Sequence, residues 1–362
     1  MQGAGHGARP LHLDPCPGRA SWFGRQDQWW PELGPDGTGS LSPIRAWAVV
    51  PDSHQELSGG CLQPKREQIG RTNMNPSDVS MQPTAAQLLE GYSIEMTAKD
   101  LPALEEAAPL IPAGTKIPVT FLPNETFEAR ITTAARVRAL GFVPIPHISA
   151  RRLQSHDELR AFLSGLQETA QVDHAFVVAG DPPEPLGPFE DALAIIRTGL
   201  LAEYGIKRVG ISGYPEGHPD IGNEKLWTSS IEKQLELNTR GHDFAIVTQF
   251  AFDATPVLDW LERVRANDVH ALVRVGIPGP ASVKTLLRFA ARCGVGASAK
   301  VMAKYGVSIT KLLTTAGPDK LIREFADRLR PERHGAVLLH LYPFGGLQAT
   351  ARWAREFQIK HA

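Results

Sequence analysis

From about Gly91 onward, short runs of apolar and β-branched residues alternate regularly with longer stretches whose apolar residues recur at helical spacing. TFEARITTAARVRAL, HDELRAFLSGLQETA and TPVLDWLERVRAN are typical of the helical stretches. Strand followed by helix, repeated along a chain, indicates parallel strands joined by crossover helices. The predicted strands span residues 92–98, 116–122, 141–148, 174–180, 208–214, 244–250, 270–277 and 336–344.

Eight such units predict a closed (β/α)8 barrel of the TIM type, because the patterned region approaches the roughly 250 residues typical of that fold. A doubly wound open sheet is the alternative. That fold is disfavoured because no GxGxxG turn follows the first predicted strand.

Residues 1–84 show no sustained period of either strand or helix, and they are rich in scattered Gly, Pro, Ser and Trp. We therefore predict a disordered or non-native N-terminal extension over 1–84, followed by one catalytic barrel domain over 85–362. A related hypothesis is that translation begins at Met74 or Met81, just before the patterned region. Intact-mass analysis of the natural protein tests it.

Composition favours a soluble, cytoplasmic protein that acts on small molecules. The net charge of -1 gives no field that would attract nucleic acid or an anionic membrane, and no apolar run approaches the length of a membrane span. Cys16, Cys61 and Cys293 form no CxxC pair, so neither a zinc cluster nor a disulfide framework is expected.

Polar side chains stand at the ends of six successive predicted strands. In a barrel the active site lies at the carboxyl ends of the strands, so these groups are expected to share one rim. They are Glu95, Thr120, His147, Asp181, Tyr214 with His218, and Gln249.

Glu95 and Asp181 are the candidate catalytic carboxylates. Glu95 interrupts an apolar strand between Ile94 and Met96, where partial desolvation would raise its pKa and suit it to general acid catalysis. A structural ion pair is the alternative for Glu95. Asp181 follows Gly180 in the stiff loop GDPPEP, and the alternative there is a solvated turn residue.

Tyr214, His218 and Gln249 are candidate binding residues. Tyr214 could stack on a planar ligand, His218 could donate to a phosphate or ribose, and the amide of Gln249 could match the edge of a pterin. The alternatives are a solvated loop histidine and a glutamine satisfied by backbone. A metal site joining His218 to His147, Glu216 or Asp220 is disfavoured because the spacing is not that of metal ligands.

Together, the order of these residues and the motifs GDPPEP, YPEGHP, TQFAFD and IPGP resembles the methylenetetrahydrofolate reductase family over about 250 residues. The resemblance implies a barrel that holds FAD and takes NADH or NADPH as hydride donor. The implied reaction reduces 5,10-methylenetetrahydrofolate to 5-methyltetrahydrofolate, a step of one-carbon metabolism. A homo-oligomer is expected by the same analogy.

The resemblance also implies roles for individual residues. Glu95 would be the acid that assists opening of the methylene bridge, and the charge of Asp181 would favour the cationic iminium. Gln249 would hold the pterin, and Phe289 would pack on the folate or nicotinamide. The flavin-contacting positions would be Thr120, His147, Gly180, Asp181, Tyr214 and His218.

The chain departs from the family pattern in three places. The first strand lacks the usual prolines, Ala179 stands where an arginine is usual, and Leu237 stands at the position of a lysine near the flavin diphosphate. Lys233 or Arg240 could replace that lysine. Two further functions stay open: oxidation of 5-methyltetrahydrofolate in the reverse direction, and a non-catalytic folate-binding subunit.

Overall fold

The computed structural model describes residues 82–122, 125–292 and 315–361. Most of the predicted N-terminal extension, residues 1–81, lies outside these ranges, so the proposed division at residue 84 stays a prediction. Within the described residues, no helix is both long enough and apolar enough to cross a membrane.

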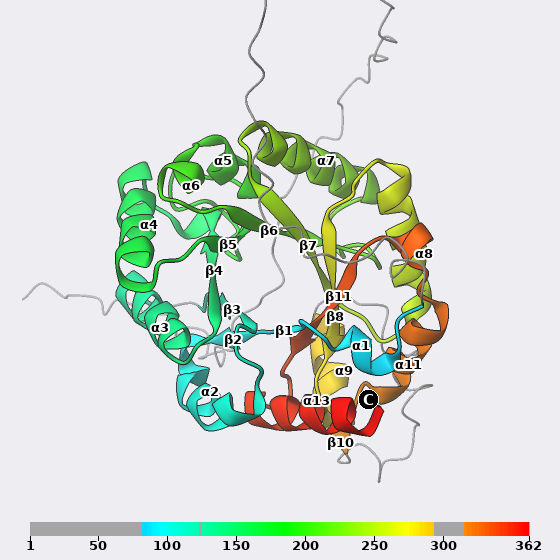
Figure 1. The fold of residues 1–362 in the computed structure, drawn as a ribbon. Coiled ribbons are helices and arrows are strands. Elements are labelled where there is room, and N and C mark those ends of the chain that lie inside the picture. Colours follow the sequence, from blue (N-terminus) through cyan, green and yellow to red (C-terminus); the bar gives the residue numbers. More distant parts are fainter. Residues whose placement is uncertain (1–81, 123–124, 293–314, 362) are drawn as a thin grey trace, which may run out of the picture.

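The predicted barrel is confirmed: a parallel sheet closes on itself, and helices surround it (Figure 1). Each strand pairs with its neighbour in sequence, and the last strand returns to the first. The strands are β1 (Ser93–Ile94) with β2 (Met96–Thr97), β3 (Lys116–Thr120), β4 (Val143–Ser149), β5 (His174–Val178), β6 (Arg208–Gly213), β7 (Asp243–Phe250), β8 (Leu272–Pro278) and β11 (Val337–Tyr342).

The first predicted strand is divided at Glu95, which is the main difference from the sequence-based boundaries. Ser93 and Ile94 pair with β11, and Ser93 also pairs with Lys116 of β3. Met96 and Thr97 continue the pairing with β3. The backbone N–H of Glu95 donates to the carbonyl of Leu341 at 3.0 Å, so the chain stays attached to β11 at the division. The barrel closes at this point because β1 pairs with β11 on one side and with β3 on the other.

Amphipathic helices cover the outside of the barrel and bury their apolar faces against it. Several begin at a side-chain cap: Thr126, Ser155, Asp191 and Asp253 each accept a backbone N–H of the first turn. The helices are α1 (Ala85–Leu88), α2 (Leu101–Ala107), α3 (Phe127–Ala139), α4 (His156–Ala170), α5 (Ala192–Arg197), α6 (Leu200–Glu203), α7 (Asn223–Thr239), α8 (Ala254–Ala266), α9 (Val283–Arg292), α11 (Asp319–Arg328), α12 (Pro331–His334) and α13 (Leu347–His361).

Short 3-10 turns and a small antiparallel ribbon lie in the connections between the barrel strands and helices. After β2 and β4 the chain forms 3-10 turns at Ala98–Asp100 and Ala150–Arg152, and a third follows α2 at Ala108–Leu110. A two-stranded antiparallel ribbon, β9 (Ala281–Ser282) with β10 (Thr315–Ala316), flanks α9. The turn at Ala150–Arg152 matters most for function, because it carries two arginines to the loop after β5.

Candidate active site

Glu95 lies inside the barrel between two histidines. Its Oε2 atom is 3.9 Å from Nε2 of His147 on β4 and 3.5 Å from Nε2 of His340 on β11. The Glu95 side chain is 20% exposed, whereas those of His147 and His340 are nearly or fully buried. Thr120, at the end of β3, also interacts with the carboxylate. The structure therefore brings together three residues predicted from sequence and adds His340, which sequence reasoning missed.

The electrostatics of Glu95 correct one prediction. Burial acts to raise the pKa of Glu95, but hydrogen bonding with His340, the electrostatic interactions with His147 and His340, and hydrogen bonding with Thr120 together lower it below its ordinary value. The sequence showed the apolar strand but not the two histidines that face it. The carboxyl is consequently ionised at neutral pH.

His147 is held neutral. Burial lowers its pKa to about 4, against the opposing attraction of Glu95. Its ring packs on Phe176 with centroids 4.7 Å apart, and its backbone carbonyl accepts a hydrogen bond from Arg130. A neutral imidazole in this position can donate or accept a hydrogen bond, which suits contact with an uncharged polar ring.

The buried His147 predicts a pH-dependent stability. Its folded-state pKa lies below its unfolded value near 6.5, so below that value the unfolded chain binds the proton first. The contribution of His147 to stability should be complete above pH 6.5 and decline by about 1.4 kcal/mol per pH unit towards pH 4.

Urea unfolding of the wild type and of His147→Gln between pH 7 and pH 4.5 checks this. We expect the variant to lose less stability on acidification than the wild type. His270→Gln, on an exposed loop, is the control that should keep the wild-type slope. Equal slopes for wild type and His147→Gln would contradict a neutral buried His147.

Asp181 is paired with Arg152 rather than free in solvent, which excludes the solvated-turn interpretation. Arg152 grips the carboxylate with two hydrogen bonds, one of them from Nε to Oδ1 at 2.6 Å. The guanidinium of Arg152 also lies 4.8 Å from the ring of Phe121. Arg152 thus fixes the orientation of Asp181 and offsets its charge, and it is a second residue that sequence reasoning missed.

Arg151 stabilises the loop that carries Asp181, and its side chain is fully buried. Its guanidinium donates to the carbonyls of Pro182, Pro183 and Glu190 at 3.0–3.1 Å and 2.9 Å. Gly180 has φ +104°, and a Cβ there would lie 3.3 Å from the Cβ of Ser149. The GDPPEP loop therefore needs both the glycine and the arginine to keep its shape.

Tyr214 and His218 come together after β6. Their rings meet edge to face with centroids 5.5 Å apart, and Nδ1 of His218 accepts the backbone N–H of Asp220 at 3.2 Å. Burial lowers the pKa of His218. The neutral ring therefore carries its proton on Nε2, which is available to donate to a ligand.

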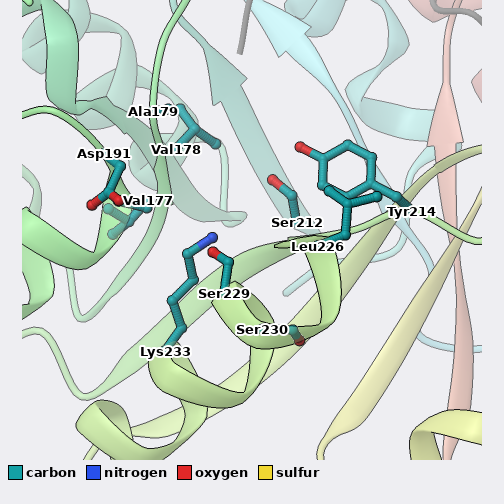
Figure 2. A pocket seen from close by; sticks show the side chains of 11 residues that line it. Val177, Val178, Ala179, Asp191, Ser212, Tyr214, Leu226, Ser229, Ser230 and Lys233 are labelled. Atoms are coloured by element: carbon teal, nitrogen blue, oxygen red, sulfur yellow. The ribbon is translucent and has the colours of Figure 1, made fainter. Parts of the chain in front are cut away.

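Lys233 of α7 enters a pocket at the ends of β5 and β6 (Figure 2). Burial lowers the pKa of Lys233, and the carboxylates of Asp191 and Glu232 oppose that effect. Ala179, the position where the family usually has arginine, lines the same pocket. The other lining residues are Val177, Val178, Asp191, Ala192, Ser212, Tyr214, Leu226, Ser229 and Ser230.

Two of the three departures from the family pattern, at Ala179 and Leu237, can now be located. Leu237 is fully buried in the core, and Arg240 pairs with Glu236 at 2.7 Å on the same helix. Lys233, one turn before Leu237, is therefore the cation that α7 supplies to this pocket. The Lys233 ammonium and the serine and tyrosine hydroxyl groups are donors of the kind that an anionic diphosphate needs. The Asp191 carboxylate in the same lining is occupied in part by the backbone N–H of Ala194, which donates to its Oδ1 at 2.9 Å.

An aromatic cluster forms a separate part of the rim. Phe289 on α9 stacks on Phe344 with centroids 4.0 Å apart and planes inclined by 12°. Phe250 and Tyr342 contact Phe344 from β7 and β11. Gln249 is half-buried at the end of β7, next to Phe250. Within the described residues, no three His, Cys, Asp or Glu side chains are grouped as metal ligands would be.

Comparison with known proteins places the chain in a family. The family model for methylenetetrahydrofolate reductase matches residues 120–314. Over 146 residues the chain is 29% identical to methylenetetrahydrofolate reductase 2 of Saccharomyces cerevisiae, covering 38% of this chain and 22% of that protein. Over 155 residues it is 24% identical to 5,10-methylenetetrahydrofolate reductase of Pectobacterium carotovorum, covering 43% of this chain and 50% of that protein. The similarity thus spans about a fifth of the first relative and half of the second.

A solved structure shares the fold. It is an uncharacterized protein from Clostridium thermocellum that binds two copies of 5-methyl-5,6,7,8-tetrahydrofolic acid. The superposition has a TM-score of 0.50 at 13% identity and covers 75% of this chain and 98% of the other. Because the family model extends over more than half of its residues, the chain belongs to the methylenetetrahydrofolate reductase family.

Proposed function

We propose that this protein reduces 5,10-methylenetetrahydrofolate to 5-methyltetrahydrofolate, with NADH or NADPH as hydride donor and FAD as the intermediate carrier. The observation that carries the proposal is the Glu95 carboxylate inside the barrel, 3.5 Å from His340 and 3.9 Å from His147. Family membership and the fold shared with a protein that binds 5-methyltetrahydrofolic acid support a folate ligand.

Glu95 would deliver the proton that opens the methylene bridge. The carboxyl is ionised in the free protein, and burial is the one influence that raises its pKa. A folate that covers the remaining exposed fifth of the side chain would increase this burial and move the pKa upward. Glu95 would therefore take up a proton from solvent as the substrate binds, and it could then act as the acid.

Asp181 would stabilise positive charge on the substrate. Opening of the bridge creates a cationic iminium, and a fixed carboxylate nearby lowers its energy. The two-point contact with Arg152 keeps Asp181 in one orientation before the charge appears. Preorganisation of this kind avoids reorientation during the reaction.

The pocket of Lys233 would hold the diphosphate of FAD, with Ser212, Ser229 and Tyr214 as further polar contacts. His147, Thr120, Gly180 and His218 would complete the contacts at neighbouring strand ends. FAD, when bound, accepts hydride from the nicotinamide and passes it to the folate. The protein's own part is to orient the two ligands and to supply the proton.

The aromatic cluster would receive the planar parts of folate and nicotinamide. Phe344 covers one face of Phe289, so a ligand ring that stacks on Phe289 would use the other face or displace Phe344. Gln249 would bind the pterin edge, since its amide both donates and accepts.

Anaerobic spectroscopy of the purified full chain tests the proposal. We expect added FAD to bind, its visible absorbance to bleach with NADH or NADPH, and the absorbance to return on adding methylenetetrahydrofolate. Folate-dependent NADH oxidation without bound flavin would indicate that hydride passes directly from the nicotinamide to the folate. Turnover only with 5-methyltetrahydrofolate and NAD would reverse the direction, and folate binding with no turnover would indicate a non-catalytic subunit.

Lys233→Met tests the cofactor pocket separately from turnover. Removing a charge-assisted contact should weaken FAD binding roughly 10- to 100-fold. The measurement is quenching of flavin fluorescence on titration with protein. Lys320→Met on α11 removes an exposed lysine of the same charge and should leave the affinity unchanged. Equal affinity of Lys233→Met and the wild type would place the diphosphate elsewhere.

A further inference from the structure

His340 belongs to neither the motifs nor the predicted roles, and it is fully buried. Its position follows from strand register: Ser93 of β1 pairs with His340 of β11. Glu95 lies two residues after Ser93, so both side chains are on the inner face of the barrel beside His340. The ring of His340 is held at a right angle to Tyr342, with centroids 4.6 Å apart.

Each nitrogen of His340 faces a different partner. Nδ1 lies 2.9 Å from Oγ of Ser93, and Nε2 lies 3.5 Å from Oε2 of Glu95. Behind Ser93 stands Arg274 of β8, whose Nη1 donates to Oγ of Ser93 at 3.2 Å and to the carbonyl of Gly91 at 3.0 Å. Arg274 is buried as well.

The direction of these hydrogen bonds follows from the chemistry of the groups. Arginine can only donate, so Oγ of Ser93 accepts from Arg274. Oγ of Ser93 keeps one hydrogen to donate, and Nδ1 of His340 lies 2.9 Å from it. When Nδ1 accepts this hydrogen, the ring proton of His340 is on Nε2, the atom that faces the Glu95 carboxylate.

We propose that Arg274, Ser93 and His340 form a positioning chain for Glu95, in which each group donates to the next and His340 presents its Nε2 proton to the carboxylate. The chain orients the Glu95 side chain and favours its ionised form until substrate arrives. His147 faces the same carboxylate from β4, and Thr120 from β3, so they are the other groups that set its protonation. The proposal rests on the proposed function in one respect only, namely that Glu95 gives its proton to the substrate.

Nitrogen-15 NMR of histidine-labelled full-length protein at pH 7.5 tests the tautomer directly. His174 is an internal reference of opposite kind, since its Nδ1 lies 2.7 Å from a carboxylate oxygen of Asp173 and its Nε2 lies 3.0 Å from Nη1 of Arg208. We expect His340 to carry its proton on Nε2 and His174 on Nδ1. His340→Gln and His174→Gln assign the signals. A proton on Nδ1 of His340, or on both nitrogens, would overturn the proposal.

A second measurement follows Glu95 itself without folate or NADH, so it is independent of any failure of the proposed function. Carbon-13 NMR of labelled glutamate side chains, assigned with Glu95→Gln, gives the proton affinity of Glu95. In Ser93→Ala we expect that affinity to rise about tenfold, because one charge-assisted hydrogen bond weakens. Ser93→Thr keeps the hydroxyl and should restore the wild-type value. An unchanged titration in a folded Ser93→Ala protein would refute the chain.

Discussion

Replacing Glu95 by glutamine should lower the turnover of methylenetetrahydrofolate by roughly 10²- to 10⁴-fold, the usual contribution of a positioned general acid. Glutamine keeps the shape of the side chain and can still accept a hydrogen bond from His340, but it has no proton to give. Folate affinity should change much less than kcat, because the acid acts at the bond-breaking step. Stopped-flow reoxidation of the reduced, reconstituted protein by the folate measures the step directly.

Glu106→Gln on α2 is the matched control, since it removes one exposed carboxylate and should leave turnover intact. Reduction of the flavin by NADH should also stay normal in Glu95→Gln, because that half of the reaction needs no proton from Glu95. If folate turnover in Glu95→Gln stayed within twofold of the wild type, another group would be the acid.

Replacing Arg151 by methionine should lower the free energy of unfolding by on the order of 3 kcal/mol. The substitution removes the shared donor of the carbonyls of Pro182, Pro183 and Glu190, whose hydrogen bonds are part-buried, at about 1 kcal/mol for each lost bond. Because these carbonyls flank Asp181, turnover should fall together with stability. Urea unfolding at pH 7 gives the first quantity.

Arg160→Met is the control for the loss of stability that we expect in Arg151→Met. Arg160 and Glu203 form an exposed pair at 3.4 Å, and such pairs contribute about 0–1 kcal/mol. A loss for Arg151→Met no larger than that for Arg160→Met would show that the loop holds its shape without the buried guanidinium.

The strand and helix pattern of this sequence was sufficient to predict the barrel. Parallel strands buried on both faces read as short apolar runs, and amphipathic helices between them leave a helical period. Both patterns depend only on residues close together in the sequence, so they can be recognised without knowledge of the fold. The family motifs similarly predicted Glu95, Asp181 and the Tyr214 loop at the strand ends.

What only the tertiary structure decided is which groups face these residues. His340 lies 245 positions after Glu95 in sequence, and the closure of the barrel alone makes them neighbours. Arg152, Arg151 and Lys233 are ordinary cations in the sequence, and their partners come from a neighbouring loop or helix. Local pattern determined where the polar groups stand along the strands, whereas pKa, pairing and orientation depend on contacts between strands distant in sequence. For that reason the sequence predicted an acid with a raised pKa, and the structure corrected it to an ionised carboxylate held between two histidines.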